Sequence, residues 1–174
     1  MKKEKKNVVI VKQDKSKLIK KKASKERIHA GKLTKQEKSK KPRIVTFACN
    51  WCSYAGADLA GVSRFQYPPS LRLIRVMCAG RITPTFVLDA FSEGADGVIV
   101  SGCHFEDCHY ISGSKKAEKV VNLTRKLMHL LGMDERRLRF ELISAAEGQK
   151  FATVAREFTK EIKKLNEKKH CKKK

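Results

Sequence analysis

The sequence predicts an α/β domain in which four parallel strands form one sheet, a flavodoxin-like or Rossmann-like sandwich. From residue 43 onward, short apolar runs alternate with segments whose apolar residues recur at helical spacing. Four such β/α units in a row favour parallel strands joined by right-handed crossovers. The segment of about one domain's length that carries this pattern is long enough to bury its own hydrophobic core.

The four expected strands are short and apolar. The run Val98, Ile99 and Val100 is the most apolar, so its strand should be central. The second strand is rich in branched apolar residues and is expected to be buried on both faces. The fourth alternates apolar and charged residues, which is typical of a half-exposed edge strand. The strands are expected at residues 44–48, 71–77, 97–101 and 138–144.

The four expected helices follow the strands and have recognisable ends. Thr83 and Pro84 form an N-cap and first-turn pair, and Gly94 is placed to end that helix. Ser114 is expected to cap the next helix, which Gly132 ends. Glu147 precedes the last helix and is expected to stabilise its N-terminus through the helix dipole. The expected helices span residues 56–63, 84–93, 115–131 and 149–165.

The charge of the chain is concentrated at its two ends. Of the net charge of +22, residues 1–42 carry +13 and residues 43–159 carry only +3. We therefore expect a basic low-complexity extension at residues 1–42, which is disordered or binds a partner. An α/β domain at 43–165 and a basic tail at 166–174 complete the expected organisation.

The sequence favours a cytoplasmic protein. The basic N-terminal region has an apolar run of only a few residues, too short for a secretory signal, and no segment is apolar enough to span a membrane. Thiols stay reduced in the cytoplasm, so clustered cysteines there indicate metal binding or redox chemistry.

Five cysteines lie directly after the expected strands. Cys49 and Cys52 follow the first strand, Cys78 the second, and Cys103 and Cys108 the third. Because the carboxyl ends of parallel strands meet at one edge of a sheet, all five are expected at the edge where such sheets bind ligands. The sixth cysteine, Cys171, lies in the lysine-rich tail and is interpreted as incidental.

Thiolates select zinc, copper(I) or iron–sulfur clusters, and four of them complete a zinc or a diiron site. A zinc site usually uses paired CxxC motifs, but the second pair here, Cys103 and Cys108, is not CxxC. Thioredoxin-like chemistry at Cys49 and Cys52 would leave the other three cysteines unexplained. Buried structural cysteines are a further alternative. No glycine loop that could hold a phosphate follows any strand, so a nucleotide site is not predicted.

Three charged or titratable residues flank the cysteines. His104 and His109 are expected to form hydrogen bonds around the site or to hold the loop, although a histidine can also replace a cysteine ligand. Arg81 follows Cys78 closely, and could neutralise negative charge at the site or remain solvated.

Four segments of the sequence, residues 49–61, 76–81, 91–98 and 102–110, strongly resemble the delta subunit of methyl-viologen-reducing hydrogenase. The resemblance covers roughly residues 43–165. It implies a [2Fe–2S] cluster bound by four of the five cysteines, with Cys49 the weakest candidate. The chain departs from the family pattern at Phe105 and Glu106, and the Glu106 carboxylate is expected to lower the potential of the cluster.

The resemblance also implies a role and partners. The chain is expected to be an electron-transfer subunit of an oxidoreductase complex in methanogenic energy metabolism. It would relay electrons from a nickel–iron hydrogenase or a formate dehydrogenase to the flavin subunit of heterodisulfide reductase. The alternative is a zinc- or thiol-containing α/β module whose basic tails bind nucleic acid. The tails lack interleaved aromatic residues, so nucleic acid is the less favoured partner.

Overall fold

The structure is a computed structural model that describes residues 41–171, with side chains to residue 168. Its centre is a sheet of four parallel strands in the order β2-β1-β3-β4. This confirms the predicted fold class, a flavodoxin-like or Rossmann-like α/β sandwich. The strands are β1 (Ile44–Cys49), β2 (Leu71–Val76), β3 (Gly97–Gly102) and β4 (Leu138–Leu142).

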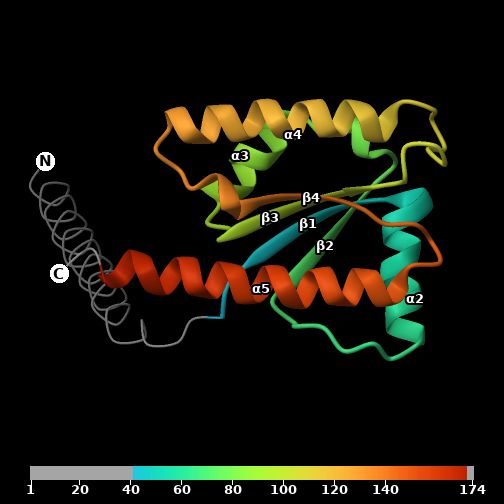
Figure 1. Ribbon diagram of the computed structural model, residues 1–174, viewed down its shortest axis with the longest axis horizontal. Coiled ribbons are helices and arrows are strands. Elements are labelled where there is room, and N and C mark those ends of the chain that lie inside the picture. The colour runs from blue at the N-terminus through green and yellow to red at the C-terminus, as the bar shows by residue number, and fades with distance from the viewer. Residues whose placement is uncertain (1–40, 172–174) are drawn as a thin grey trace, which may run out of the picture. The chain divides into compact units, whose positions relative to one another are not determined.

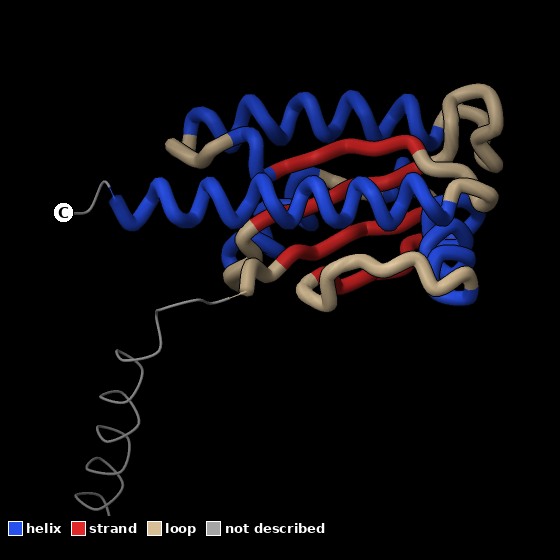
Figure 2. Tube along the Cα trace, turned by 60° about the horizontal axis from the view of Figure 1, so that its bottom comes forward, coloured by secondary structure: helices blue, strands red, loops and turns tan. Residues whose placement is uncertain are grey.

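Helices cover both faces of the sheet (Figure 1, Figure 2). Helices α3 and α4 pack on one face, and α2 and α5 pack on the other. Three short helical turns, η1 to η3, lie between the main elements. The helices are α2 (Ala55–Val62), α3 (Pro84–Ser92), α4 (Gly113–Leu130) and α5 (Gly148–Cys171), and the turns are η1 (Asn50–Tyr54), η2 (Ala79–Arg81) and η3 (Glu135–Arg137).

The burial of the strands follows their place in the sheet. Strand β3 is central and buried at every position, and β4 is an edge strand, as predicted. The prediction that residues 71–77 are buried on both faces is wrong, because β2 is the other edge strand and Ile74 and Met77 are exposed. A branched apolar run does not by itself distinguish a central strand from an edge strand.

The helix ends mostly lie where the sequence places them. Thr83 is the N-cap of α3, and Gly94 and Gly132 adopt positive φ after α3 and α4, where glycine is favoured. The prediction that Ser114 caps a helix is wrong, because Ser112 is the N-cap and Ser114 is already inside α4. Helix α5 also continues beyond residue 165 into the basic tail. The predicted N-terminal extension lies almost entirely outside the described residues.

The packing of α5 on the sheet allows the hydrophobic core to be tested by substitution. Phe158 of α5 is fully buried and packs against Gly97, where even a methyl group would overlap its ring. Removing this ring should leave a cavity that the close packing cannot fill.

We expect Phe158→Ala to lower the free energy of unfolding by about 3–5 kcal/mol, as measured by urea denaturation of the full chain. Leu130→Ala, at an exposed position of α4, is the control and should change it by less than about 0.5 kcal/mol. Equal effects of the two substitutions would contradict the assigned core.

Candidate metal centre

The site lies between β1 and β3, the two neighbouring strands from which the chain crosses the sheet in opposite directions. From β1 the chain crosses to β2 on one side, whereas from β3 it crosses to β4 on the other. The crossover helices therefore diverge at the carboxyl ends of β1 and β3, which leaves the crevice that α/β sheets use for ligands. Cys49 is the last residue of β1, and Cys103 directly follows β3. The pairing of these two strands brings the two sulfurs to within 3.9 Å of each other.

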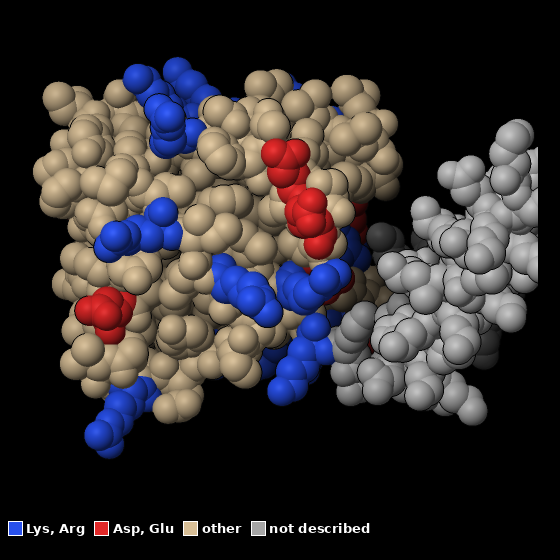
Figure 3. Space-filling view, turned by 180° about the vertical axis from the view of Figure 1, so that it is seen from behind, with Lys and Arg blue, Asp and Glu red and all other residues tan. Residues whose placement is uncertain are grey.

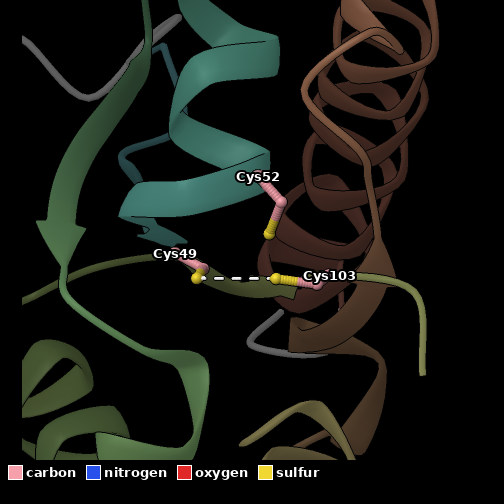
Figure 4. Close-up of side chains that lie close together, drawn as sticks. All are labelled: Cys49, Cys52 and Cys103. Atoms are coloured by element: carbon pink, nitrogen blue, oxygen red, sulfur yellow. Dashed lines mark hydrogen bonds between the residues drawn. The ribbon is translucent and has the colours of Figure 1, made fainter. Parts of the chain in front are cut away.

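Cys52 completes a group of three buried sulfurs, the inner cysteines Cys49, Cys52 and Cys103. The chain leaves β1 through η1, a turn of π-helix, which carries Cys52 back over the strand end. The three sulfurs lie within 4.8 Å of one another, and their residues are 1%, 5% and 4% exposed. Figure 4 shows the three side chains converging from the end of β1, from η1 and from the segment that follows β3. Such a group could hold a metal ion.

The remaining two cysteines, Cys78 and Cys108, form the outer pair. Both are partly exposed and both lie against Gly113, the first residue of α4. A methyl group at Gly113 would overlap Cys78 Sγ and lie 3.3 Å from Cys108 Sγ. A methyl group at Gly80 would lie 2.9 Å from the Cα and carbonyl oxygen of Gly113, so Gly80 has no room for a side chain. The two glycines therefore let η2 and α4 approach closely enough to bring these sulfurs together.

Cys49 is the inner cysteine that contacts the segment carrying Cys78. Its thiol points at the carbonyl oxygen of Met77, 3.8 Å away, in the loop that leads to Cys78. The N–H group of Ala79, the first residue of η2, approaches its sulfur. The inner cysteines and the outer pair are therefore neighbouring parts of one site at one edge of the sheet.

Proton sharing dominates the electrostatics of the inner cysteines. The Cys52 thiol donates a hydrogen bond to Cys49 and lowers the pKa of Cys49 to about 5. The same hydrogen bond, together with burial, raises the pKa of Cys52, and burial raises the pKa of Cys103. One of the three thiols thus ionises readily while the other two retain their protons. A cation that bound all three would have to displace those protons and replace their stabilising effect.

The outer pair differs in its surroundings. Burial raises the pKa of Cys78. Burial also acts to raise the pKa of Cys108, but the N–H groups of Ser114 and Tyr110 outweigh it and the net pKa is lowered. The hydroxyl of Ser114 also donates to Cys108 Sγ over 3.8 Å. A thiolate at Cys108 is therefore stabilised before any metal is bound.

The three flanking residues take different positions. Nε2 of His104 lies 2.8 Å from Oε2 of Glu147, so this ring bonds a carboxylate. The ring of His109 stacks on exposed Trp51, with centroids 4.0 Å apart, and so joins the segment that carries Cys108 to η1. Arg81 ends η2 and is exposed. Their predicted roles beside the site remain predictions.

Two features of the site were missed from the sequence. The carboxylate of Glu147 accepts a hydrogen bond from the backbone N–H of Ser144 and also bonds the ring of His104. It therefore joins the loop after β4 to the loop after β3. The contacts of Gly113 were also missed. The sequence did contain a signal for Gly113. It is a glycine beside the expected start of a helix, and glycine is often found where another part of the backbone approaches closely.

The comparison with known proteins agrees with the resemblance. Residues 44–166 match the family described as methyl-viologen-reducing hydrogenase, delta subunit. The chain belongs to this family. The matched segment contains all the inner cysteines and the outer pair, and it excludes the basic extension and Cys171.

Several known proteins are similar in sequence to this chain over most of the described domain. The F420-non-reducing hydrogenase vhc iron-sulfur subunit of Methanococcus voltae is 52% identical over 122 residues, which are 70% of this chain and 85% of the relative. The F420-non-reducing hydrogenase iron-sulfur subunit of Archaeoglobus profundus is 51% identical over 124 residues, 71% of this chain and 90% of the relative.

A third relative is much longer. It is a subunit of the ferredoxin/F(420)H(2)-dependent CoB-CoM heterodisulfide reductase of Methanosarcina acetivorans, and it is 49% identical over 128 residues. These are 74% of this chain but only 16% of the relative. The domain described here is therefore similar to one segment of that protein.

The surface gives two further observations. No helix among the described residues has the length and apolar character needed to cross a membrane. On the face drawn in Figure 3, Lys and Arg side chains lie in separate groups divided by uncharged and acidic surface. This face of the described domain does not show the continuous basic stripe expected of a nucleic-acid-binding surface.

The close approach at Gly113 can be tested by substitution. We expect Gly113→Ala to displace Cys78, so that the purified chain retains less metal than the wild type, as measured by elemental analysis. Gly61→Ala, in helix α2, is the matched control because nothing lies within 4 Å of the added methyl. It should retain metal fully, with stability raised by up to about 1 kcal/mol. Full metal retention by Gly113→Ala would contradict the assigned packing.

The link between Glu147 and His104 predicts a dependence on pH. The Ser144 N–H group and the His104 ring lower the pKa of Glu147 from its ordinary 4.5 to about 2. Its ionised form therefore stabilises the fold fully above pH 4.5, and this stabilisation is lost as the pH falls toward 2.

We expect Glu147→Gln to be less stable than the wild type at pH 7, with a difference that shrinks below pH 4.5. Urea denaturation across this range, with both proteins in the same metallation state, measures it. The effect should be modest because a third of the side chain is exposed to solvent. A difference that stays constant or grows as the pH falls would contradict the assignment.

Proposed function

We propose that this chain is an iron–sulfur electron-transfer subunit that binds one [2Fe–2S] cluster at the carboxyl edge of its sheet. The observation that carries the proposal is the convergence of five cysteines from three separate loops on one edge. Iron–sulfur clusters are bound by cysteine thiolates, four for a diiron cluster. The relatives named as iron-sulfur subunits support the same cofactor class.

The grouping of the sulfurs fits a diiron cluster better than a single zinc ion. A structural zinc ion needs four ligands around one point. Here the sulfurs divide into the three inner cysteines and the outer pair, and the outer pair lies apart against Gly113. A cluster with two irons bridged by sulfide needs two thiolates at each end, which is the arrangement that these two groups can supply.

The same grouping bears on which cysteine is spare. If Cys78 and Cys108 hold one iron, the other iron needs two of the inner cysteines, and the surplus residue is one of the three. We propose Cys52, Cys78, Cys103 and Cys108 as the ligands and Cys49 as the residue left over. Cys49 is fixed within β1 by its pairing with Val76, so it is the least able to adjust to a cluster.

When bound, the cluster would supply reversible one-electron transfer. The chain's own residues set the conditions for it. The inner cysteines are buried and exclude water from one end of the site. Backbone N–H groups of Gly80, His109 and Ser114 are positioned to donate to the sulfurs, which stabilises added negative charge and raises the reduction potential. His104, His109 and Arg81 are proposed to support the loops around these ligands.

The proposed role is a relay within a larger complex in the cytoplasm. The family and the relatives named as hydrogenase and heterodisulfide reductase subunits support electron transfer between such proteins. We propose a nickel–iron hydrogenase or formate dehydrogenase as the donor and the flavin subunit of a heterodisulfide reductase as the acceptor, in methanogenic energy metabolism. The partly exposed outer pair would be the side of the site nearest to a partner.

The test is to purify the chain anaerobically and to measure iron, acid-labile sulfide, visible absorbance and the EPR spectrum after reduction with dithionite. We expect about two irons and two sulfides per chain and a reduced-state signal. Serine substitution of Cys52, Cys78, Cys103 or Cys108 should abolish or strongly alter the signal, while Cys49→Ser should retain it. Cys171→Ser, outside the family segment, is the control and should match the wild type.

Other results would contradict the proposal. A colourless protein with one zinc, or a chain that binds no iron after cluster reconstitution, would exclude an iron–sulfur cluster. If Cys49→Ser loses the signal and another inner cysteine does not, the cluster remains and the choice of the spare residue is wrong.

A further inference from the structure

The two ends of the cysteine site differ in exposure. The inner cysteines are almost fully buried, whereas Cys78 and Cys108 are partly open to solvent. Added negative charge is less costly near water than in a buried apolar site. Exposure alone therefore favours the outer pair as the end at which the site can accept an electron.

Hydrogen-bond donors increase this asymmetry. The N–H groups of Tyr110, Gly113 and Ser114 approach Cys108 Sγ, and the Ser114 hydroxyl donates to the same sulfur. The N–H of Gly80 donates to Cys78 Sγ over 3.4 Å. Donors to the sulfurs stabilise the more negative, reduced state of a thiolate-bound metal group.

The first turn of α4 adds to the effect of these donors. Gly113 and Ser114 are the first two residues of this 18-residue helix, whose first turn contains no acidic residue. The positive end of the helix dipole therefore points at the outer pair. The charge of Lys116 acts on Cys78 in the same direction. Glu106 and Asp107 oppose it, but both are exposed and screened by solvent.

Ser114 is held in place for this role. It is 1% exposed, and its oxygen lies where a side chain on Gly102 would have to go, 2.9 Å from the position of the missing Cβ. Because Ser112 is the N-cap of α4, Ser114 is not needed to begin the helix. Its buried hydroxyl instead has a cysteine sulfur as its partner.

The inner cysteines contain a matched counterpart. Ser53 is fully buried, and its hydroxyl lies 3.6 Å from Cys52 Sγ. Cys103 receives an N–H group from His109. Each end of the site thus has a buried serine beside a cysteine. At the inner cysteines, the N–H group of Trp51 at the start of η1 acts on Cys49, the proposed spare residue, whereas at the outer pair the N–H groups of the first turn of α4 act on Cys108, a proposed ligand.

We infer that Ser114 and the first turn of α4 direct the transferred electron to the end of the site formed by Cys78 and Cys108, and that Ser114 is a positioning residue that raises the reduction potential. This rests on the proposed function. With the cluster bound, the step would pass one electron from a reduced iron–sulfur group of the donor enzyme to one Fe(III), which would become Fe(II). No bond forms or breaks, and the added charge is stabilised by the donors around Cys108.

The experiment compares Ser114→Ala with Ser53→Ala in the full chain with its cluster. Each variant removes one buried hydroxyl beside one cysteine. Thr124→Val is the control, because it removes a buried hydroxyl from the same helix whose partner is a backbone carbonyl. The midpoint potential is measured by an EPR-monitored redox titration, and the iron–thiolate stretching frequencies by resonance Raman spectroscopy.

We expect Ser114→Ala to shift the midpoint potential to more negative values and to change the stretching frequencies. Ser53→Ala should give a smaller shift, and Thr124→Val none. An equal or larger shift in Ser53→Ala, or an unchanged potential in Ser114→Ala, would overturn the inference. Iron content and far-UV circular dichroism identify any variant that has lost its fold or cluster; Ser114→Cys, a weaker donor, would then replace Ser114→Ala and should lower the potential.

The inference and the proposed function fail in different ways. A wild-type chain that binds no iron–sulfur cluster contradicts the proposed function. A wild-type chain with a normal cluster, whose potential does not respond to Ser114, contradicts the inference and leaves the proposed function intact.

Discussion

The parallel pairing of β1 with β3 is the constraint on which the rest of the site depends. It places the ends of two central strands side by side at the point where their crossovers diverge, and the sulfurs of Cys49 and Cys103 meet there at 3.9 Å. In the parallel order, each strand enters the sheet in the same direction, so every following loop emerges at the same edge. Cysteines separated by more than fifty positions can therefore share one site without any long-range motif in the sequence.

Close backbone packing is the second requirement. The outer pair comes together because Gly80 and Gly113 allow η2 to approach the start of α4. A side chain on Gly80 would meet the backbone of Gly113, and one on Gly113 would displace the sulfur of Cys78. The same contact brings the N–H groups of α4 within reach of Cys108. Packing and electrostatics are thus coupled at this point. The glycines that leave room for the two sulfurs also let the N–H groups of α4 lie close to them.

Much of the fold and the location of the site could be predicted from local patterns. The apolar run at Val98–Val100 indicated a central strand, and cysteines after successive strands indicated one shared edge. The branched run in β2 was misread because apolar content reports burial of side chains, whereas an edge position depends on which strand pairs with which. The division into three inner cysteines and an outer pair also depends on loop paths, such as the π-helical turn that ends at Tyr54, that periodicity does not encode.

Ser114 shows why a serine that caps a helix must be distinguished from a serine that donates a hydrogen bond to a cysteine of the site. From the sequence, a serine close to an expected helix start looks like a cap, because serine hydroxyls commonly accept from free N–H groups there. In the structure Ser112 occupies the cap position and Ser114 turns its hydroxyl toward Cys108. A hydroxyl buried beside a thiol contributes little as a neutral hydrogen bond, but it becomes a charge-assisted donor once the thiol ionises. The contact therefore gains strength when Cys108 is a thiolate, the form in which a cysteine binds a metal, and this links the serine to the chemistry of the site more closely than to the stability of the helix.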